Sequence, residues 1–246
     1  MSKDKTIYIG TSGWSYDHWV NKFYPEDLKK NEWLSYYAEQ FNTVELNMSF
    51  YQFPFPNMLK GWYKKIPDQF QMTMKANRNI THRRQFKDTD ELVNRFYQRA
   101  EFMEDKMGCI LYQTPPTFKY EEETVKQLTS FFKTLDHDYM NVMEFRHPDW
   151  WNEEVYELLK DHQIGFCVVS GLDMPQEVRV TADVAYFRFH GPGEGYASKY
   201  SESDIQQWRD KIKSVLEDVD RVYCYFNNDM EGYAVENARY LQQLLE

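Results

Sequence analysis

Short runs rich in β-branched and aromatic residues recur eight times along the 246-residue chain, and a longer segment follows each of them. We expect strands at 6–10, 43–47, 70–76, 108–113, 141–146, 165–170, 184–190 and 221–227. Between them, apolar residues at helical spacing predict helices near 31–40, 57–65, 90–105, 121–135, 152–161, 203–217 and 231–245. This alternation is typical of repeated βα units around a parallel sheet.

Eight such units favour a parallel sheet that closes into a barrel. The length of the chain is close to the roughly 250 residues typical of a (β/α)8 barrel, the fold of triosephosphate isomerase. A doubly wound sheet is the alternative, but the chain has no dinucleotide-binding fingerprint. No linker or change of composition divides it, so residues 1–246 are expected to form a single α/β barrel domain. Its sixth unit lacks a convincing helix.

The charge and the cysteines limit the partners and the location. A formal net charge of −10 argues against non-specific binding to nucleic acid or to an anionic membrane. The amino terminus has no apolar signal core, and no apolar stretch approaches the ~20 residues that span a bilayer. Cys109, Cys167 and Cys224 lie far apart in apolar runs, which predicts buried free thiols. We expect a cytoplasmic protein without a membrane partner.

Polar residues interrupt the ends of several predicted strands in pairs two residues apart. The pairs are Glu45 with Asn47, Thr73 with Lys75, Glu144 with Arg146, Arg188 with His190 and Asn227 with Asp229; Gln113 and Ser170 end their strands similarly. A spacing of two places each pair on one face of its strand. Because barrel enzymes keep their active sites at the carboxyl ends of the strands, we expect these side chains to line a pocket there.

A purely structural role is the alternative for this polar ring. Its carboxylates, Glu45, Glu144 and Asp229, nearly balance its cations, Lys75, Arg146 and Arg188. Apolar replacements of buried ion pairs are often neutral or stabilising, however, so stability alone does not explain a whole ring of them. A functional pocket is therefore the preferred interpretation.

Three residues are the candidates for catalysis. Glu144, beside Arg146, would transfer a proton, and Glu45 would be the second carboxylate. Lys75 could be a Schiff-base nucleophile, although an ordinary lysine paired with Glu45 is the preferred interpretation.

A wider set is expected to bind the substrate, including an aromatic wall. The set comprises Trp14, Tyr16, Asn47, Tyr51, Gln113, Arg146, Arg188, His190, Asn227, Asn228 and Asp229. Three loops add to it. Loop 10–14 could offer backbone amides to an anion, loop 191–200 is a lid, a binding loop or an inert connection, and Asn228 or Asp229 could cap the last helix.

Histidines near the strand ends raise the possibility of a metal. His82, His147 and His190 lie close to carboxylates in sequence, but no pair has the spacing of metal ligands on one helix. No metal ligand is therefore predicted, and the cofactor is left open.

The segments themselves resemble a known family. In order along about residues 9–241 they are IGTSGWSYDHW, FYP, FNTVELNMSFYQFP, NITH, QTPPTF, EFRHPDW, FRFHG and YFNNDMEGYAVENA. Together they resemble the YecE-like family, domain of unknown function 72. The resemblance implies a barrel of the triosephosphate isomerase type with these motifs clustered at one end, and it implies no reaction.

Three functional hypotheses follow. The first is an enzyme that performs acid/base chemistry, hydrolysis or isomerisation, on a small polar molecule such as a phosphorylated or sugar-like compound. The second is a divalent-metal isomerase or nuclease-like barrel that uses Glu45, Glu144, His147, His190 and Asp229. The third is a module that binds a ligand or protein without turnover. Oligomeric state and pathway are not predicted.

Overall fold

Eight strands form one parallel sheet in the computed structural model, which describes residues 5–193 and 198–246. They are β1 (Thr6–Thr11), β2 (Thr43–Leu46), β3 (Gln71–Lys75), β4 (Met107–Gln113), β5 (Met140–Glu144), β6 (Gly165–Ser170), β7 (Val184–Phe189) and β8 (Arg221–Phe226). The order in the sheet is β1-β8-β7-β6-β5-β4-β3-β2, and every pair is parallel. The predicted α/β barrel is confirmed.

The barrel closes where β1 meets β2. A parallel bridge joins Ser12 to Glu45 at this seam. A Cβ atom on Gly10 would lie 2.1 Å from the carbonyl oxygen of Thr43, so only glycine permits this approach of the two backbones. The seam holds Glu45 beside the first strand and thereby helps to set the position of a predicted site residue.

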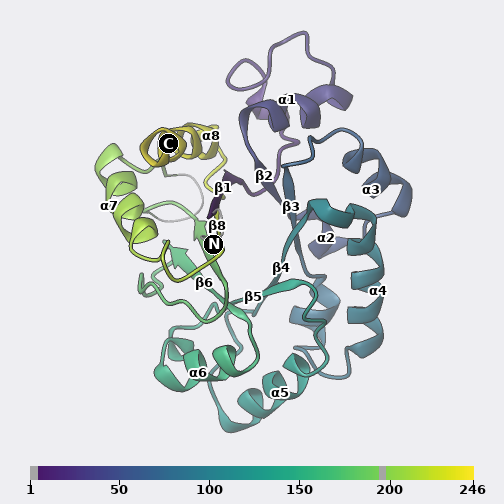
Figure 1. Ribbon diagram of the computed structural model, residues 1–246, viewed down its shortest axis with the longest axis vertical. Coiled ribbons are helices and arrows are strands. Elements are labelled where there is room, and N and C mark those ends of the chain that lie inside the picture. The colour runs from purple at the N-terminus through teal and green to yellow at the C-terminus, as the bar shows by residue number, and fades with distance from the viewer. Residues whose placement is uncertain (1–4, 194–197) are drawn as a thin grey trace.

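Helices surround the strands (Figure 1). They are α1 (Trp33–Gln40), α2 (Met48–Tyr51), α3 (Pro56–Tyr63), α4 (Asp90–Ala100), α5 (Glu122–Phe132), α6 (Glu153–Asp161), α7 (Glu202–Lys213) and α8 (Tyr233–Leu245). In α4 the residues Val93, Phe96, Tyr97 and Ala100 are buried, which is the apolar stripe that helical spacing predicts. Asn152 caps α6 and Ser201 caps α7, because each side chain accepts a hydrogen bond from a backbone N–H in the first turn.

The differences from the predicted elements are local. Residues 171–183, between β6 and β7, contain no helix, which confirms the irregular sixth unit. The sequence does not predict the short helix α2 or a π-helical turn at Asn79–Arg83, because each is too short to show a period. The helix predicted to reach residue 105 ends at Ala100, and a tighter turn follows over Glu101–Lys106.

The core has two parts, one inside the barrel and one between strands and helices. Inside, Tyr8 stacks on Tyr223 with ring centroids 4.7 Å apart, and the rings of Tyr186 and Tyr225 pack beside them. All three cysteines are buried and free, as predicted. The ring contacts of Tyr8, Tyr186, Tyr223 and Tyr225 show that aromatic side chains fill much of the barrel interior. In the part of the chain that the structure describes, no helix is long and apolar enough to cross a membrane.

Candidate functional site

A cavity of about 570 Å³ lies at the carboxyl ends of the strands. Its lining comes from most of the units of the barrel and comprises Tyr16, Asn47, Phe50, Tyr51, Lys75, His82, Gln113, Pro116, Arg146, Arg188, His190 and Asn227. Nine of these residues belong to the set that the sequence predicts, and the structure brings them together around one space. Its volume is within the range of pockets that hold small ligands.

Arg188 lies at the floor of this cavity and joins the two predicted carboxylates. Its Nε and Nη2 donate to Glu45 Oε2 and Oε1 at 3.0 and 2.7 Å, and its Nη1 donates to Glu144 Oε2 at 2.6 Å. All three side chains have at most 1% of their surface exposed. Arg188, rather than Lys75, is thus the partner of Glu45.

The remaining partners of the two carboxylates complete a hydrogen-bonded floor. Glu45 accepts from Ser12 Oγ at 2.7 Å and from Tyr186 Oη at 2.6 Å. Glu144 accepts from Gln113 Nε2 at 2.9 Å and from Arg146 Nη1 at 3.0 Å.

This floor keeps both glutamates ionised. Burial alone would raise the pKa of Glu45, but the charge and hydrogen bonds of Arg188 outweigh it and hold the pKa below its ordinary value. The pKa of Glu144 is held well below its ordinary value in the same way, against burial, by Arg188 and Arg146. With all their oxygens accepting hydrogen bonds, these carboxylates are suited to positioning the cations rather than to donating a proton.

Lys75 stands in the cavity wall apart from the carboxylates. Its Nζ donates to Gln113 Oε1 at 2.9 Å and lies 4.4 Å from the centre of the Phe50 ring. Burial and the charge of Arg188 lower the pKa of Lys75 to about 8. The expectation that Lys75 pairs with Glu45 is wrong, because Arg188 on a strand across the barrel reaches that carboxylate instead.

Two histidines complete the wall in their neutral form. Burial lowers the pKa of His190 to about 4, and its Nδ1 lies 3.2 Å from Asn227 Nδ2. Burial and the charges of Lys75 and Arg146 lower the pKa of His82 to about 4. Both rings therefore offer hydrogen bonds without charge near neutral pH.

Three predicted binding residues do not line the cavity. Trp14 is buried and packs edge-on against Trp62 at 5.1 Å between ring centroids. Asn228 is buried and donates to Ser198 O and Asn237 Oδ1. The backbone carbonyl of Asp229 lies 2.7 Å from His18 Nε2, away from the cavity.

The predicted loops differ in outcome. The amides of Thr11 and Ser12 already bond to Tyr37 Oη and Phe226 O, so these two do not offer themselves to an anion. The last helix begins after Gly232, so the expected cap by Asn228 or Asp229 is wrong. Residues 194–197 of the loop 191–200 lie outside the described residues, and the prediction of a lid or binding loop stays a prediction.

Sequence reasoning missed some of the lining. Phe50 lies on the unpredicted helix α2, and Pro116 follows β4 in a loop. His82, considered only as a metal ligand, lies in the unpredicted π-helical turn. Such turns occur frequently at functional sites, but their sequence carries no pattern that would reveal them.

The donor set does not favour a metal here. Glu45 and Glu144, the carboxylates of the metal hypothesis, both bind the guanidinium of Arg188. His147 Nδ1 lies 3.3 Å from Asp149 Oδ2, and neither residue lines the cavity. Among the residues that the structure describes, no three His, Cys, Asp or Glu side chains form a group that could hold a metal ion.

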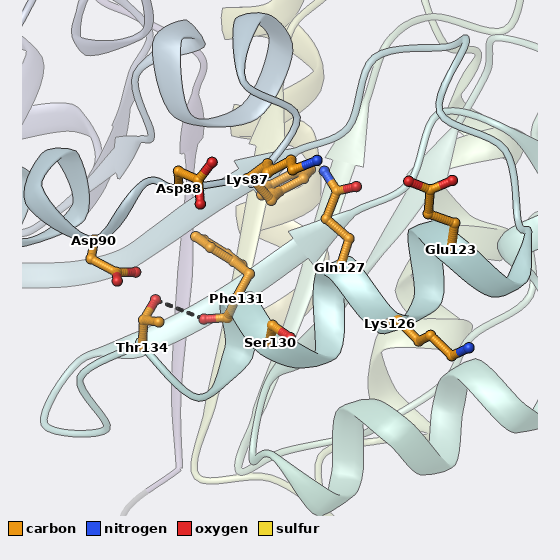
Figure 2. Close-up of a pocket in the computed structure, with 10 residues that line it drawn as sticks. Lys87, Asp88, Asp90, Glu123, Lys126, Gln127, Ser130, Phe131 and Thr134 are labelled. Carbon is orange, nitrogen blue, oxygen red and sulfur yellow. Dashed lines mark hydrogen bonds between the residues drawn. The ribbon is translucent and has the colours of Figure 1, made fainter.

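Figure 2 shows a second cavity, of about 470 Å³, where the turn before α4 faces α5 on the outside of the barrel. Gln127 extends from α5 and donates to the carbonyl of Gln85 in that turn. The charged side chains there, Lys87, Asp88, Asp90, Glu123 and Lys126, have both signs and are exposed. Water screens exposed charges, so the buried cationic cavity is the better candidate site.

The fold and the cavity define a (β/α)8 barrel protein with a cationic pocket at the carboxyl end of its strands. Residues 8–246 match the family model described as Protein of unknown function DUF72. The chain belongs to this family, which confirms the resemblance found in the sequence.

Relatives and solved structures agree with this membership. UPF0759 protein YunF of Bacillus subtilis is 27% identical over 271 residues, covering 98% of this chain and 95% of the relative. A DUF72 family protein of Thermotoga maritima, 33% identical, superposes with a TM-score of 0.89 over 97% of this chain and 98% of its own. Another from Enterococcus faecalis, 22% identical, covers 98% and 95% with a TM-score of 0.86 and supports the fold alone. The reaction has to be argued from the cavity.

Proposed function

We propose that this protein is an enzyme that binds a small anionic molecule, such as a phosphorylated or carboxylated sugar-like compound, and performs acid/base chemistry on it, as in hydrolysis or isomerisation. One observation carries the proposal. Lys75, Arg146 and Arg188 line the cavity, whereas no Asp or Glu appears among its described lining residues, in a chain of net charge −10. Glu45 and Glu144 beneath the floor compensate two of these three charges, so the cavity keeps an excess of positive charge within a negatively charged chain, which favours an anionic ligand.

The floor of the cavity also supports binding of an anion. Glu45 and Glu144 orient Arg188 through short hydrogen bonds, so the guanidinium needs little reorganisation when a ligand arrives. Arg146, on the wall, has the planar donor geometry that suits a phosphate or carboxylate. Tyr51, with 65% of its surface exposed, supplies an apolar ring at the rim.

Lys75 is the group best suited to proton transfer. An acid or base is most effective when its pKa lies near the working pH, and the pKa of Lys75 is lowered to about 8. Glu144, the first candidate from sequence, remains a positioning residue in this proposal because its oxygens already accept bonds from Arg188, Arg146 and Gln113.

A thermal-shift screen with phosphate, sulfate, sugar phosphates, nucleotides and divalent metals tests the binding step. A ligand at a hundred times its Kd should stabilise the folded state by about 2.7 kcal/mol. The shift should disappear in Lys75→Met and persist in the control Lys126→Met, which removes the same charge from the outer cavity between α4 and α5. Loss in the control alone would contradict the proposed site.

Incubation with the stabilising compound then separates an enzyme from a binding module. We expect a product that forms with wild type and not with Lys75→Met. Quantitative recovery of the unchanged compound would favour the module, and stabilisation by metals alone would favour the metal-dependent alternative.

We also propose that residues 1–246 form one domain and that the protein is cytoplasmic. Pairing of strands from β1 to β8 supports the first statement. The three free thiols support the second, since cysteines remain reduced in that compartment.

A further inference from the structure

The ε-amino group of Lys75 has an unusual environment for a lysine set into a cavity wall. Within the described residues, no carboxylate oxygen lies within ion-pair distance of its Nζ. Its neighbours are the amide oxygen of Gln113, the ring of Phe50 and, in the same cavity, the guanidinium groups of Arg146 and Arg188. Burial and the charges of the two arginines disfavour the protonated amine and outweigh the Gln113 oxygen, the Phe50 ring and the more distant carboxylates, which favour it.

Lys106 shows how this chain treats a buried lysine whose role is structural. Its Nζ donates to the carbonyls of Tyr63 and Ile66 at 3.2 and 2.9 Å and lies 3.2 Å from Asp68 Oδ1. Three oxygen atoms, one of them a carboxylate, stabilise its charge, whereas Lys75 has one neutral oxygen and the Phe50 ring among its described partners. This difference from Lys106 indicates that the amine of Lys75 is available for reaction and does not serve only to stabilise the fold.

We infer that Lys75 is a nucleophile that forms an imine with an aldehyde or ketone group of the anionic substrate. The inference rests on the anion binding of the proposed function, because the cationic wall would hold the anionic end of that substrate while its carbonyl carbon meets Nζ; it replaces proton transfer by Lys75 with covalent attack. It narrows the substrate class to small carbonyl compounds that carry a phosphate or carboxylate.

The step balances without any further reactant. The neutral amine attacks the carbonyl carbon, the π electrons of the C=O bond move to oxygen, and a proton passes from nitrogen to that oxygen to give a carbinolamine. The C–O bond then breaks, and the second hydrogen of the amine leaves with the oxygen as water. The product has a C=N bond, whose protonated form withdraws electrons from the neighbouring carbon.

The proportion of neutral amine agrees with this role. With its pKa lowered from 10.5 to about 8, about 9% of Lys75 is unprotonated at pH 7, compared with about 0.03% of an ordinary lysine. The nucleophilic form is therefore about 300-fold more abundant at Lys75.

Pyridoxal 5′-phosphate is a suitable probe because it combines an aldehyde with a phosphate. The full-length protein would be mixed with an equimolar amount at pH 7, reduced with sodium borohydride to fix any imine, and digested for mass spectrometry. We expect about tenfold more adduct on Lys75 than on any other lysine, which is well below the about 300-fold larger proportion of unprotonated amine at Lys75. Lys106 should carry none, and Lys75→Arg should lose the adduct while keeping its thermal stability.

The controls separate this inference from the proposed function. Pyridoxine 5′-phosphate, which lacks the aldehyde, should protect Lys75 from labelling. If it stabilises the protein but the aldehyde leaves Lys75 unmodified, anion binding stands and the covalent step is wrong. If neither compound stabilises the protein and labelling spreads over exposed lysines, both are wrong. Mapping on the wild type decides the matter even if Lys75→Arg does not fold.

Discussion

Replacement of Arg188 by leucine tests the buried floor of the cavity. The substitution removes the guanidinium from between Glu45 and Glu144, whose side chains are 0% exposed. Glu144 keeps Arg146 and Gln113, but Glu45 keeps only the hydroxyl groups of Ser12 and Tyr186 among its described partners. Breaking a buried pair in this way costs about 3–5 kcal/mol, so we expect that loss in the free energy of unfolding at pH 7.

The pH dependence of the loss has a definite sign. In the wild type the pKa of Glu45 lies below its unfolded value, so its contribution is complete above about pH 4.5 and is lost as the pH falls through the lowered pKa. Without Arg188, burial should raise the pKa of Glu45 above the unfolded value. The folded state then binds one more proton, and stability should rise by about 1.4 kcal/mol for each pH unit of acidification down to about pH 4.5.

Urea unfolding between pH 5 and 8 measures this slope. The double variant Arg188→Leu/Glu45→Gln has no uncompensated Glu45 charge and should recover much of the loss without the reversed slope. Arg179→Leu, which breaks exposed ion pairs with Glu153 and Glu177, should cost at most about 1 kcal/mol. A loss for Arg188→Leu below about 1 kcal/mol, or the same slope as in the wild type, would refute the argument.

Three further predictions concern the wall and the seam. Sulfate, whose charge is constant above pH 6, should bind more weakly as the pH rises through about 8, because Lys75 loses its proton there. Calorimetry should detect no binding to Lys75→Met at any pH, and an affinity of the wild type that does not change with pH would contradict the prediction. Gln113→Leu should lower the free energy of unfolding by about 1–3 kcal/mol, since Glu144 and Lys75 each lose a buried hydrogen bond; an unchanged urea midpoint would contradict this. Gly10→Ala should lower the free energy of unfolding more than Gly61→Ala does. A Cβ atom at Gly10 would lie 2.1 Å from Thr43 O, whereas one at Gly61 would meet nothing within 4 Å. Equal urea midpoints for the two variants would show that the backbone at the seam moves to accommodate the methyl group.

The sequence by itself determined the fold class and much of the site. Eight βα units follow from apolar runs and helical spacing, which are local properties of the chain. The polar pairs at strand ends also follow from local pattern, because a spacing of two places both members on one face. Asn47, Lys75, Arg146, His190 and Asn227 line one cavity, whereas Asp229, the partner of Asn227, lies away from it.

Only the tertiary structure decided which charges pair. Glu45 and Arg188 are 143 residues apart, and no spacing rule relates them. Barrel closure places β2 and β7 around one lumen, where the long side chain of Arg188 reaches both carboxylates. Lys75, at the end of the next strand β3, is thereby left with Gln113 as its partner.

The chemical roles changed for the same reason. From sequence, Glu144 is the natural proton-transfer group and Lys75 an ordinary paired lysine. A pKa depends on burial and on neighbours brought from distant strands, so it is a property of the fold rather than of the residue. Strand and helix patterns are local and appear in the sequence, whereas the reactivity of Lys75 depends on contacts that exist only once the barrel has closed.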